Sequence, residues 1–392
     1  MNFILAPATC FLYNAPSLLK KFGLSLVIIS RYLIKEVLSS LLGVTLVLLL
    51  IFLSNQLVRY LSYAASGKIA SHLLLQLMGF EIPYLLALLL PLGLYLGIIL
   101  AYGRLYADSE MTVLNACGLS INRLFAITSV LAAIVAAVVV MLMLWVNPLI
   151  IQEKGREIAQ DTVIDTLRPG RFQVIGDGRR VVYVEQISRN RQRANNLFIA
   201  EEQKKLNDTG RPSWVVVSAA SGYQAKNHDT HDNFIVSDQG YRYEGIPGQN
   251  EYKVIQFQKY AVRIPNATMS SGHQETEGIP SAQLWQDYKN PLKAAELQWR
   301  FSIGISVLVL MVLAIPLCKV RPRQGRYASL FPAMLIYIIY VNLLFVARNW
   351  VEIRIVPIYL GMWWVHVLVL AIGILLLVMQ QRYLTQPRRH SA

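Results

Sequence analysis

Charged residues are scarce in this sequence: Asp, Glu, Lys and Arg make up 15% of the 392 residues, while hydrophobic residues make up 55%. The hydrophobic residues are gathered into blocks, which a soluble core does not require. Each helix that crosses a bilayer needs about 20 consecutive apolar residues. Six blocks approach that length: Val37–Leu53, Tyr84–Ala101, Leu124–Trp145, Ile303–Leu317, Leu330–Val346 and Ile358–Met379. The sequence therefore predicts an α-helical membrane protein with six spans, three on each side of a hydrophilic segment.

Cysteine is also scarce. None of the three cysteines, Cys10, Cys117 and Cys318, lies in the hydrophilic segment, so no disulfide is expected there. Cys117 and Cys318 lie near predicted span ends, where we interpret them as small apolar fillers.

The chain lacks the usual sequence signatures of catalysis. It contains no G-x-x-x-x-G-K-[ST] string, so it is not expected to hydrolyse nucleotides with a P-loop of its own. Outside residues 151–300 it has only five carboxylates, none in the middle of a predicted span: Glu36, Glu81, Asp108, Glu110 and Glu352. Acid–base chemistry on a lipid and proton-coupled transport both need such groups in the membrane or at its face. We therefore expect no catalytic residue, and energy for any transport must come from a partner.

A metal site is not expected either. The nearest approach to one is His228-x-x-His231 with Asp229 and Asp232, and it lacks a further defined ligand at the spacing of a zinc site. The sequence thus predicts no metal and no cofactor.

The net charge of +14 could suggest a nucleic acid partner, but the basic residues are unevenly placed. Residues 151–300 hold 20 Lys and Arg against 18 Asp and Glu, which leaves 17 against 5 in the rest of the chain. The excess therefore lies in short loops and tails beside the spans. That pattern indicates membrane topology and gives no reason to expect binding to nucleic acid.

The positions of these bases predict the orientation in the membrane. Thirteen would share one side: Lys20, Lys21, Arg31, Lys35, Arg104, Arg123, Lys319, Arg321, Arg323, Arg326, Arg382, Arg388 and Arg389. The opposite short loops hold four: Arg59, Lys68, Arg348 and Arg354. Both termini should therefore be cytoplasmic, and the hydrophilic segment should face outward.

Four parts are expected along the chain. Residues 28–150 hold spans one to three, residues 151–300 form the outward domain, and residues 301–392 hold spans four to six and a basic tail. Residues 1–27 are an N-terminal extension in which an apolar stretch precedes the positive charges, the reverse of a signal peptide. One hypothesis is that translation begins near Val27.

The sequence pattern of the outward domain predicts β structure. Six stretches rich in Val, Tyr, Phe and Ile are separated by turn residues: Arg180–Glu185, Leu197–Ala200, Trp214–Ser218, Asn233–Val236, Tyr241–Tyr243 and Tyr252–Val262. Several short strands of this kind favour a sandwich or a β-jelly-roll.

Three strings in the sequence resemble the lipopolysaccharide-export permease family, LptF/LptG. They are Leu105–Gly118, which looks like a cytoplasmic coupling helix, Ala295–Arg300 with the following span and the Arg321–Arg326 run, and Asn55–Arg59. The Arg323-Gln324-Gly325-Arg326 run favours the LptF branch over the LptG branch. The similarity extends from about Ile28 to the C-terminus.

This resemblance implies a set of partners and a location. Two such subunits, one LptF-like and one LptG-like, would pair in the inner membrane, each with six spans and a periplasmic β-jelly-roll. An LptB-like ATPase dimer would dock on the cytoplasmic side, and an LptC-like bitopic protein would complete the complex. ATP hydrolysis by that ATPase would then drive lipopolysaccharide out of the outer leaflet and onto a periplasmic bridge. External work is needed because the acyl chains are held in the bilayer by their buried apolar area.

Residues 107–118 are the coupling helix that the resemblance implies. Asp108 or Ser109 can cap this helix through a side-chain oxygen, and Gly118 can end it. Glu110 would be its main charged contact with the ATPase, with apolar contacts from Met111, Val113 and Leu114. The alternative is that Glu110 only stabilises the helix end, worth about 0.3–1 kcal/mol.

Arg59, at the outer end of span one, is the candidate contact for a lipid A phosphate, because a guanidinium binds phosphate through two hydrogen bonds. The family often has a second basic residue three positions earlier, where this chain has Gln56. Recognition would then rest more on Arg59 or be shared with the partner subunit. The alternative is that Arg59 anchors the helix to any headgroup.

Three other functions are weighed against the permease. A mechanotransmission subunit would pass ATP-driven motion to a periplasmic partner without carrying lipid, but such proteins usually have four spans. A membrane scaffold would have no transport role. A lipid-modifying enzyme is disfavoured because acid–base groups are missing.

Overall fold

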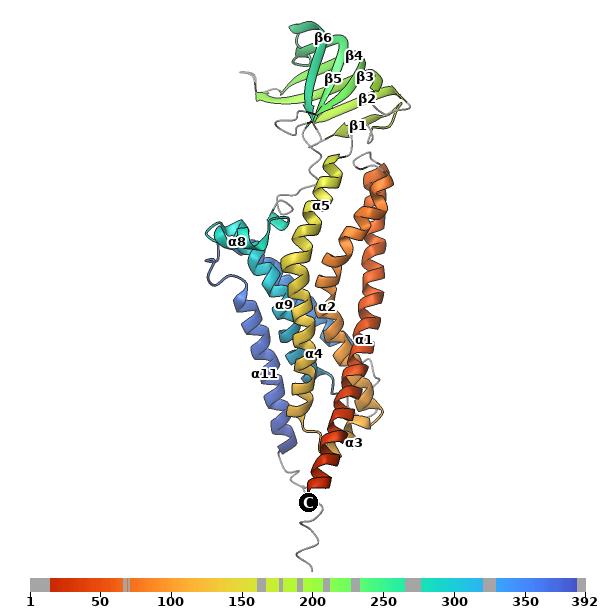
Figure 1. Cartoon of the computed structure of the whole chain (residues 1–392). Coiled ribbons are helices and arrows are strands. Elements are labelled where there is room, and N and C mark those ends of the chain that lie inside the picture. The colour runs from red at the N-terminus through yellow and green to blue at the C-terminus, as the bar shows by residue number, and fades with distance from the viewer. Residues whose placement is uncertain are drawn as a thin grey trace, which may run out of the picture. The chain divides into compact units, whose positions relative to one another are not determined.

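The computed structural model describes residues 15–65, 69, 71–160, 167–175, 179–188, 193–206, 212–226, 233–264, 276–319 and 329–385 (Figure 1). The chain forms two compact units. The helical unit comprises Met1–Ile51, Pro83–Pro148 and Ile279–Ala392, and the β unit comprises Phe52–Ile82 and Leu149–Gly278. Residues 1–14, the Arg321–Arg326 run, the His228–Asp232 cluster and the end of the basic tail lie outside the described residues. Residues 15–27 of the expected extension begin helix α1.

The described helices lie before residue 161 and after residue 280. Their bounds are α1 Ala15–Ala65, a 3₁₀ turn Ser71–Leu73, α2 Leu74–Ala107, α3 Glu110–Ala116, α4 Ile121–Met141, a π-helix Leu142–Val146, α5 Asn147–Gln160, α8 Ser281–Gln286, α9 Pro291–Leu317, α10 Leu330–Glu352 and α11 Trp363–Thr385. Among the described residues, six helical segments are long and apolar enough to cross a membrane: Ile28–Ala65, Leu74–Ala107, Ile121–Glu157, Pro291–Leu317, Leu330–Glu352 and Trp363–Gln380. The predicted arrangement of three spans, an inserted domain and three spans is confirmed.

Two span boundaries differ from the prediction. Helix α9 begins at Pro291, ten residues before the expected boundary at 301, because Asn290 caps it by accepting a hydrogen bond from the Leu292 amide at 3.1 Å. Glu296 and Arg300 therefore lie inside this helix and are buried. Helix α11 begins at Trp363 and not at Ile358, since residues 358–362 form turns around Gly361, which has φ +45°.

Helices α1 and α2 approach closely at Gly93 and Gly97, two small residues four positions apart on α2. A Cβ atom at Gly97 would lie 2.9 Å from the backbone nitrogen of Leu41, and one at Gly93 would overlap the Thr45 hydroxyl. The two backbones are therefore in contact, and any side chain at Gly97 would force them apart.

The two described cysteines differ. Cys318 is buried, and burial raises the pKa of its thiol to about 12, so it is an inert filler as predicted. Cys117 is exposed, so the same interpretation is wrong there. It is the residue that follows the last residue of α3, Ala116.

The β unit contains one six-stranded antiparallel sheet. Its strands are β1 Phe172–Ile175, β2 Arg180–Ile187, β3 Arg193–Leu206, β4 Pro212–Lys226, β5 Asn233–Gly245 and β6 Tyr252–Ile264, and they pair in chain order. An inserted β domain is thus confirmed. Neighbouring described strands are antiparallel along the whole order β1-β2-β3-β4-β5-β6.

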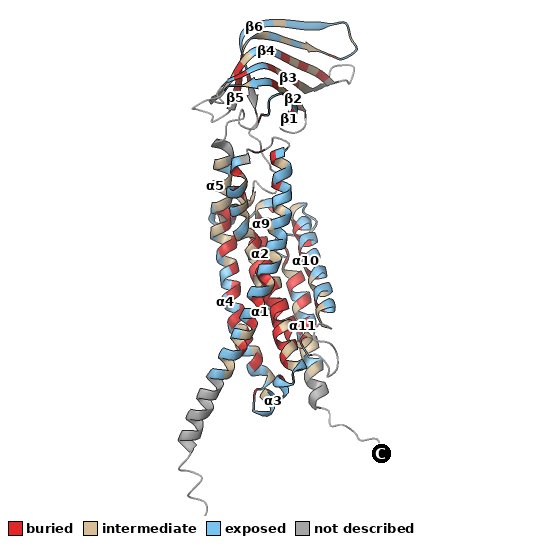
Figure 2. Ribbon diagram, turned by 90° about the vertical axis from the view of Figure 1, so that its right-hand side faces the viewer, coloured by how far each residue is buried: buried red, intermediate tan, exposed pale blue. Residues whose placement is uncertain are grey.

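The sheet ladder is interrupted along one line that crosses five strands. The register skips Glu185, Asn196, Ala220, Gln239 and Gln258. Asn196 and Gln239 have positive φ, of 50° and 51°. The register is the same on both sides of the line, and one hydrophobic cluster contains residues from both sides of it. Figure 2 shows buried positions in red along strands of the sheet.

That line also explains one wrong strand assignment. The sequence suggests a turn at Ser237–Gly240 between two short strands, whereas β5 runs through it without a break. Strand β1 is the one that the predicted set omits.

Candidate functional site

Helix α3 lies where the sequence predicts a coupling helix. Its N-terminal boundary is Ser109, whose backbone has φ 61° and ψ 4°, and its side chain makes no capping hydrogen bond. The predicted side-chain cap is therefore wrong for Ser109, because a left-handed backbone does not have the extended conformation of a capping residue. Asp108 ends the preceding turn through its amide, which donates to the Arg104 carbonyl at 2.9 Å.

The end of α3 follows the expectation for Gly118. This residue has φ +97°, its amide donates to the Asn115 carbonyl at 3.1 Å, and the Leu119 amide donates to the Leu114 carbonyl at 3.0 Å. The pair of bonds is a Schellman motif, which needs a residue that tolerates positive φ. Gly118 thus ends the helix as predicted.

One face of α3 is packed against its own helical unit. The Met111 side chain is 0% exposed, and Leu114 packs against the same core. Met111 is therefore inaccessible in this structure, whereas Leu114 stays partly exposed. Val113 is 61% exposed, and Asp108, Ser109 and Glu110 are exposed as well. The surface that α3 presents is more polar than predicted.

Glu110 is tied to helix α1. The Tyr32 hydroxyl donates to Glu110 Oε2 at 2.8 Å, and one turn further along α1 Glu36 accepts an ion pair from Arg104 at 2.8 Å. Tyr32 and Glu36 are four residues apart and lie on the same helical face. The corner between α2 and α3 is thus joined to α1 by two side-chain links, which the sequence analysis did not identify.

Arg59 and Gln56 lie on α1 in the β unit, three residues apart. Arg59 is exposed and makes no ion pair with the described residues, while Gln56 is half-buried. The neighbouring Tyr60 is 3% exposed and anchors this helix end. Arg59 is therefore exposed at an anchored helix end, and no described carboxylate forms an ion pair with it.

A polar cluster fixes that helix end. Glu81 of α2 accepts hydrogen bonds from the Tyr60 hydroxyl and from Lys154 of α5, the latter at 2.6 Å, and Lys154 lies over the Tyr60 ring at 5.6 Å. Three helices are thus joined at one carboxylate, and the Lys154 charge is neutralised.

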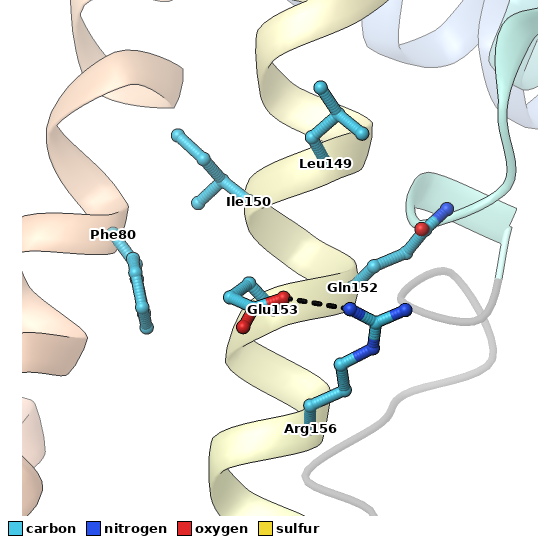
Figure 3. A pocket seen from close by; sticks show the side chains of 6 residues that line it. All are labelled: Phe80, Leu149, Ile150, Gln152, Glu153 and Arg156. Carbon is cyan, nitrogen blue, oxygen red and sulfur yellow. Dashed lines mark hydrogen bonds and ion pairs between the residues drawn. The ribbon is translucent and has the colours of Figure 1, made fainter.

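A shallow cavity of about 370 Å³ lies between α2 and α5 in the same unit (Figure 3). It is lined by Phe80, Leu149, Ile150, Gln152, Glu153 and Arg156. Glu153 and Arg156 pair with each other at 3.1 Å, so this cavity offers apolar surface and no uncompensated charge.

A buried network of four charged residues joins α9 and α10. Arg300 Nε donates to Glu296 Oε1 at 2.9 Å, Arg348 Nη2 donates to Glu296 Oε2 at 2.9 Å, and Arg348 Nε donates to Glu352 Oε1 at 3.0 Å. Arg348 also lies over the Trp299 ring at 5.2 Å. Sequence reasoning missed this network by assigning Glu296 and Arg300 to the outward domain.

No group of three or more His, Cys, Asp or Glu side chains able to hold a metal ion occurs among the described residues. The side chains brought together here bind each other or project from helix surfaces. They are suited to contact with a partner protein or a lipid headgroup.

Known proteins match over most of the chain. Residues 31–379 match the family model for the lipopolysaccharide export system permease LptF/LptG. The lipopolysaccharide export system permease protein LptF of Escherichia coli K12 is 33% identical over 353 residues, which cover 89% of this chain and 94% of that protein. The protein of the same name from Shigella flexneri matches equally. This multi-span membrane protein therefore belongs to the lipopolysaccharide export permease family LptF/LptG.

Proposed function

We propose that the chain is the LptF-type permease subunit of an ABC transporter that extracts lipopolysaccharide from the outer leaflet of the inner membrane and passes it to a periplasmic bridge. One observation carries this proposal: the family match includes both sets of three helices and the whole β sheet between them. The relatives are export permeases by name, and the chain has no nucleotide-binding string of its own. A separate ATPase must then supply the work of removing acyl chains from the bilayer.

The proposed complex contains an LptG-like permease, an LptB-like ATPase dimer and an LptC-like bitopic protein. Purification of the tagged chain from native membranes tests this assembly. We expect the ATPase, the paralogous permease and lipopolysaccharide to co-purify. Recovery of the ATPase without lipopolysaccharide would favour the mechanotransmission subunit, and recovery of neither would favour the scaffold.

The proposed orientation has both termini in the cytoplasm and the β unit in the periplasm. It rests on the thirteen basic residues assigned to one side of the membrane against four on the other. A cysteine placed at the exposed Asn195 should react with a membrane-impermeant thiol reagent in spheroplasts. Cys117 is exposed on the cytoplasmic side in this orientation and should react only after lysis. The opposite pattern would reverse the assignment.

Arg59 is proposed to meet a lipid A phosphate at the outer leaflet. Lys154 and Arg156 are both paired with carboxylates, whereas Arg59 makes no such pair among the described residues. A hydrogen bond to a charged group is worth about 1.5–3 kcal/mol, so Arg59→Gln should weaken lipopolysaccharide retention by about tenfold or more.

The measurement is capture of lipopolysaccharide by a photocrosslinking residue at position 59 in exporting cells. The same residue at Leu38, also exposed on α1 but in the helical unit, is the control. Capture from neither position, or equal capture of any anionic lipid at 59, would favour simple anchoring of the helix.

A further inference from the structure

The helix that leads from the helical unit into the β unit contains a π-helix, Leu142–Val146. Single π turns are rare in proteins. Those that occur lie frequently at functional sites. The Leu144 carbonyl within this turn accepts a hydrogen bond from the Ser281 hydroxyl at 2.7 Å. The chain passes into the β unit between Pro148 and Leu149, four residues after Leu144.

Ser281 lies where the chain returns from the β unit, three residues after Gly278. The segment that precedes α9 is thus fastened to the π turn by a single hydroxyl. The departing and returning segments of the β unit are joined by this contact within the helical unit.

Arg300 of α9 holds the same returning segment. Its Nη1 donates to the Ile279 carbonyl at 3.1 Å and to the Ser281 hydroxyl at 2.8 Å. The Ser281 hydroxyl therefore accepts from Arg300 and donates to Leu144 at once, a chain of bonds from α9 to the π turn. The Arg300 side chain is 0% exposed, and a buried ionisable group in a membrane span marks a functional site by default.

The buried charge network makes this anchor rigid. Glu296 binds Arg300 and Arg348 through separate oxygens, and Arg348 binds Glu352. Two positive and two negative groups balance, and helices α9 and α10 are held together. Arg300 is thus held by Glu296 on one side and donates to Ser281 and Ile279 on the other.

We propose that Arg300 and Ser281 are positioning residues that transmit movement of α9 to the two chain segments that connect the helical unit with the β unit. In this proposal the departing helix bends at the π turn, and the Ser281 hydroxyl couples that turn to α9. This proposal rests on the proposed export function, and it makes Ser281 a determinant of how much lipopolysaccharide is released for each ATP hydrolysed.

The test uses the whole complex in proteoliposomes, with lipopolysaccharide release to an acceptor protein and ATP hydrolysis measured on the same sample. Ser281→Ala removes both bonds of the hydroxyl, while Ser281→Thr keeps the hydroxyl at a half-buried position. Ser306→Ala is the matched control, because this buried serine of α9 bonds only within its own helix, to the Ile303 carbonyl.

We expect Ser281→Ala to lower release per ATP at least fivefold with hydrolysis within twofold of wild type. Ser281→Thr should restore the ratio, and Ser306→Ala should leave it unchanged. An unchanged ratio in Ser281→Ala, or an equal fall in Ser306→Ala, would overturn the proposal, even if the yield of complex falls. A wild-type complex that hydrolyses ATP and releases no lipopolysaccharide would instead count against the proposed function.

Discussion

Glu110→Lys is expected to abolish lipopolysaccharide export while the protein stays folded in the membrane. Removing one partner of a buried charged pair at an interface costs about 2–5 kcal/mol, which is enough to prevent docking of an ATPase on α3. A lysine would also lose the hydrogen bond from Tyr32. If Glu110 only interacted with the helix dipole, the loss would be about 0.3–1 kcal/mol, and export would continue.

Two measurements separate these outcomes: recovery of the ATPase with the tagged variant, and export of lipopolysaccharide by cells that depend on it. Tyr32→Phe is the matched control, since it removes the link between α1 and α3 and keeps the Glu110 charge. It should retain ATPase docking. Normal docking and export by Glu110→Lys would show that α3 is not the coupling element in the proposed sense.

Glu296→Gln is expected to give the largest loss of stability of any conservative substitution in the helical unit. It leaves Arg300 and Arg348 without their shared carboxylate, and both are buried. Removing one partner of a buried pair costs about 3–5 kcal/mol. The unfolding temperature and the yield of monodisperse protein in detergent measure the effect.

Glu153→Gln is the control for that substitution. Glu153 and Arg156 form an exposed pair, and pairs of this kind contribute about 0–1 kcal/mol. This variant should behave like wild type. If the two glutamine variants unfold at the same temperature, the buried network does not stabilise the helical unit.

The six spans can be predicted from the sequence because each requires a long apolar block, which the other described helices and strands lack. The start of α9 could not be placed in the same way. Its first three turns contain Lys293, Glu296 and Arg300, charged residues that lower the hydropathy, although Glu296 and Arg300 neutralise each other inside the protein. The four-residue spacing from Glu296 to Arg300 and from Arg348 to Glu352 was the readable signal.

The candidate coupling helix shows a different limit. Its existence and its end at Gly118 follow from local chemistry, since a left-handed backbone there needs glycine. The face that this helix buries does not follow from local chemistry, because two helical turns hold too few residues to show a periodic pattern. Met111 and Leu114 turn inward only because the rest of the helical unit is there to receive them.

The contact between α1 and α2 at Gly97 limits the routes open to a lipid. With the Leu41 backbone nitrogen 2.9 Å from the position of a Cβ atom, no acyl chain can pass between these helices at that level. A route for the acyl chains of lipopolysaccharide at that level therefore has to use another face of the helical unit.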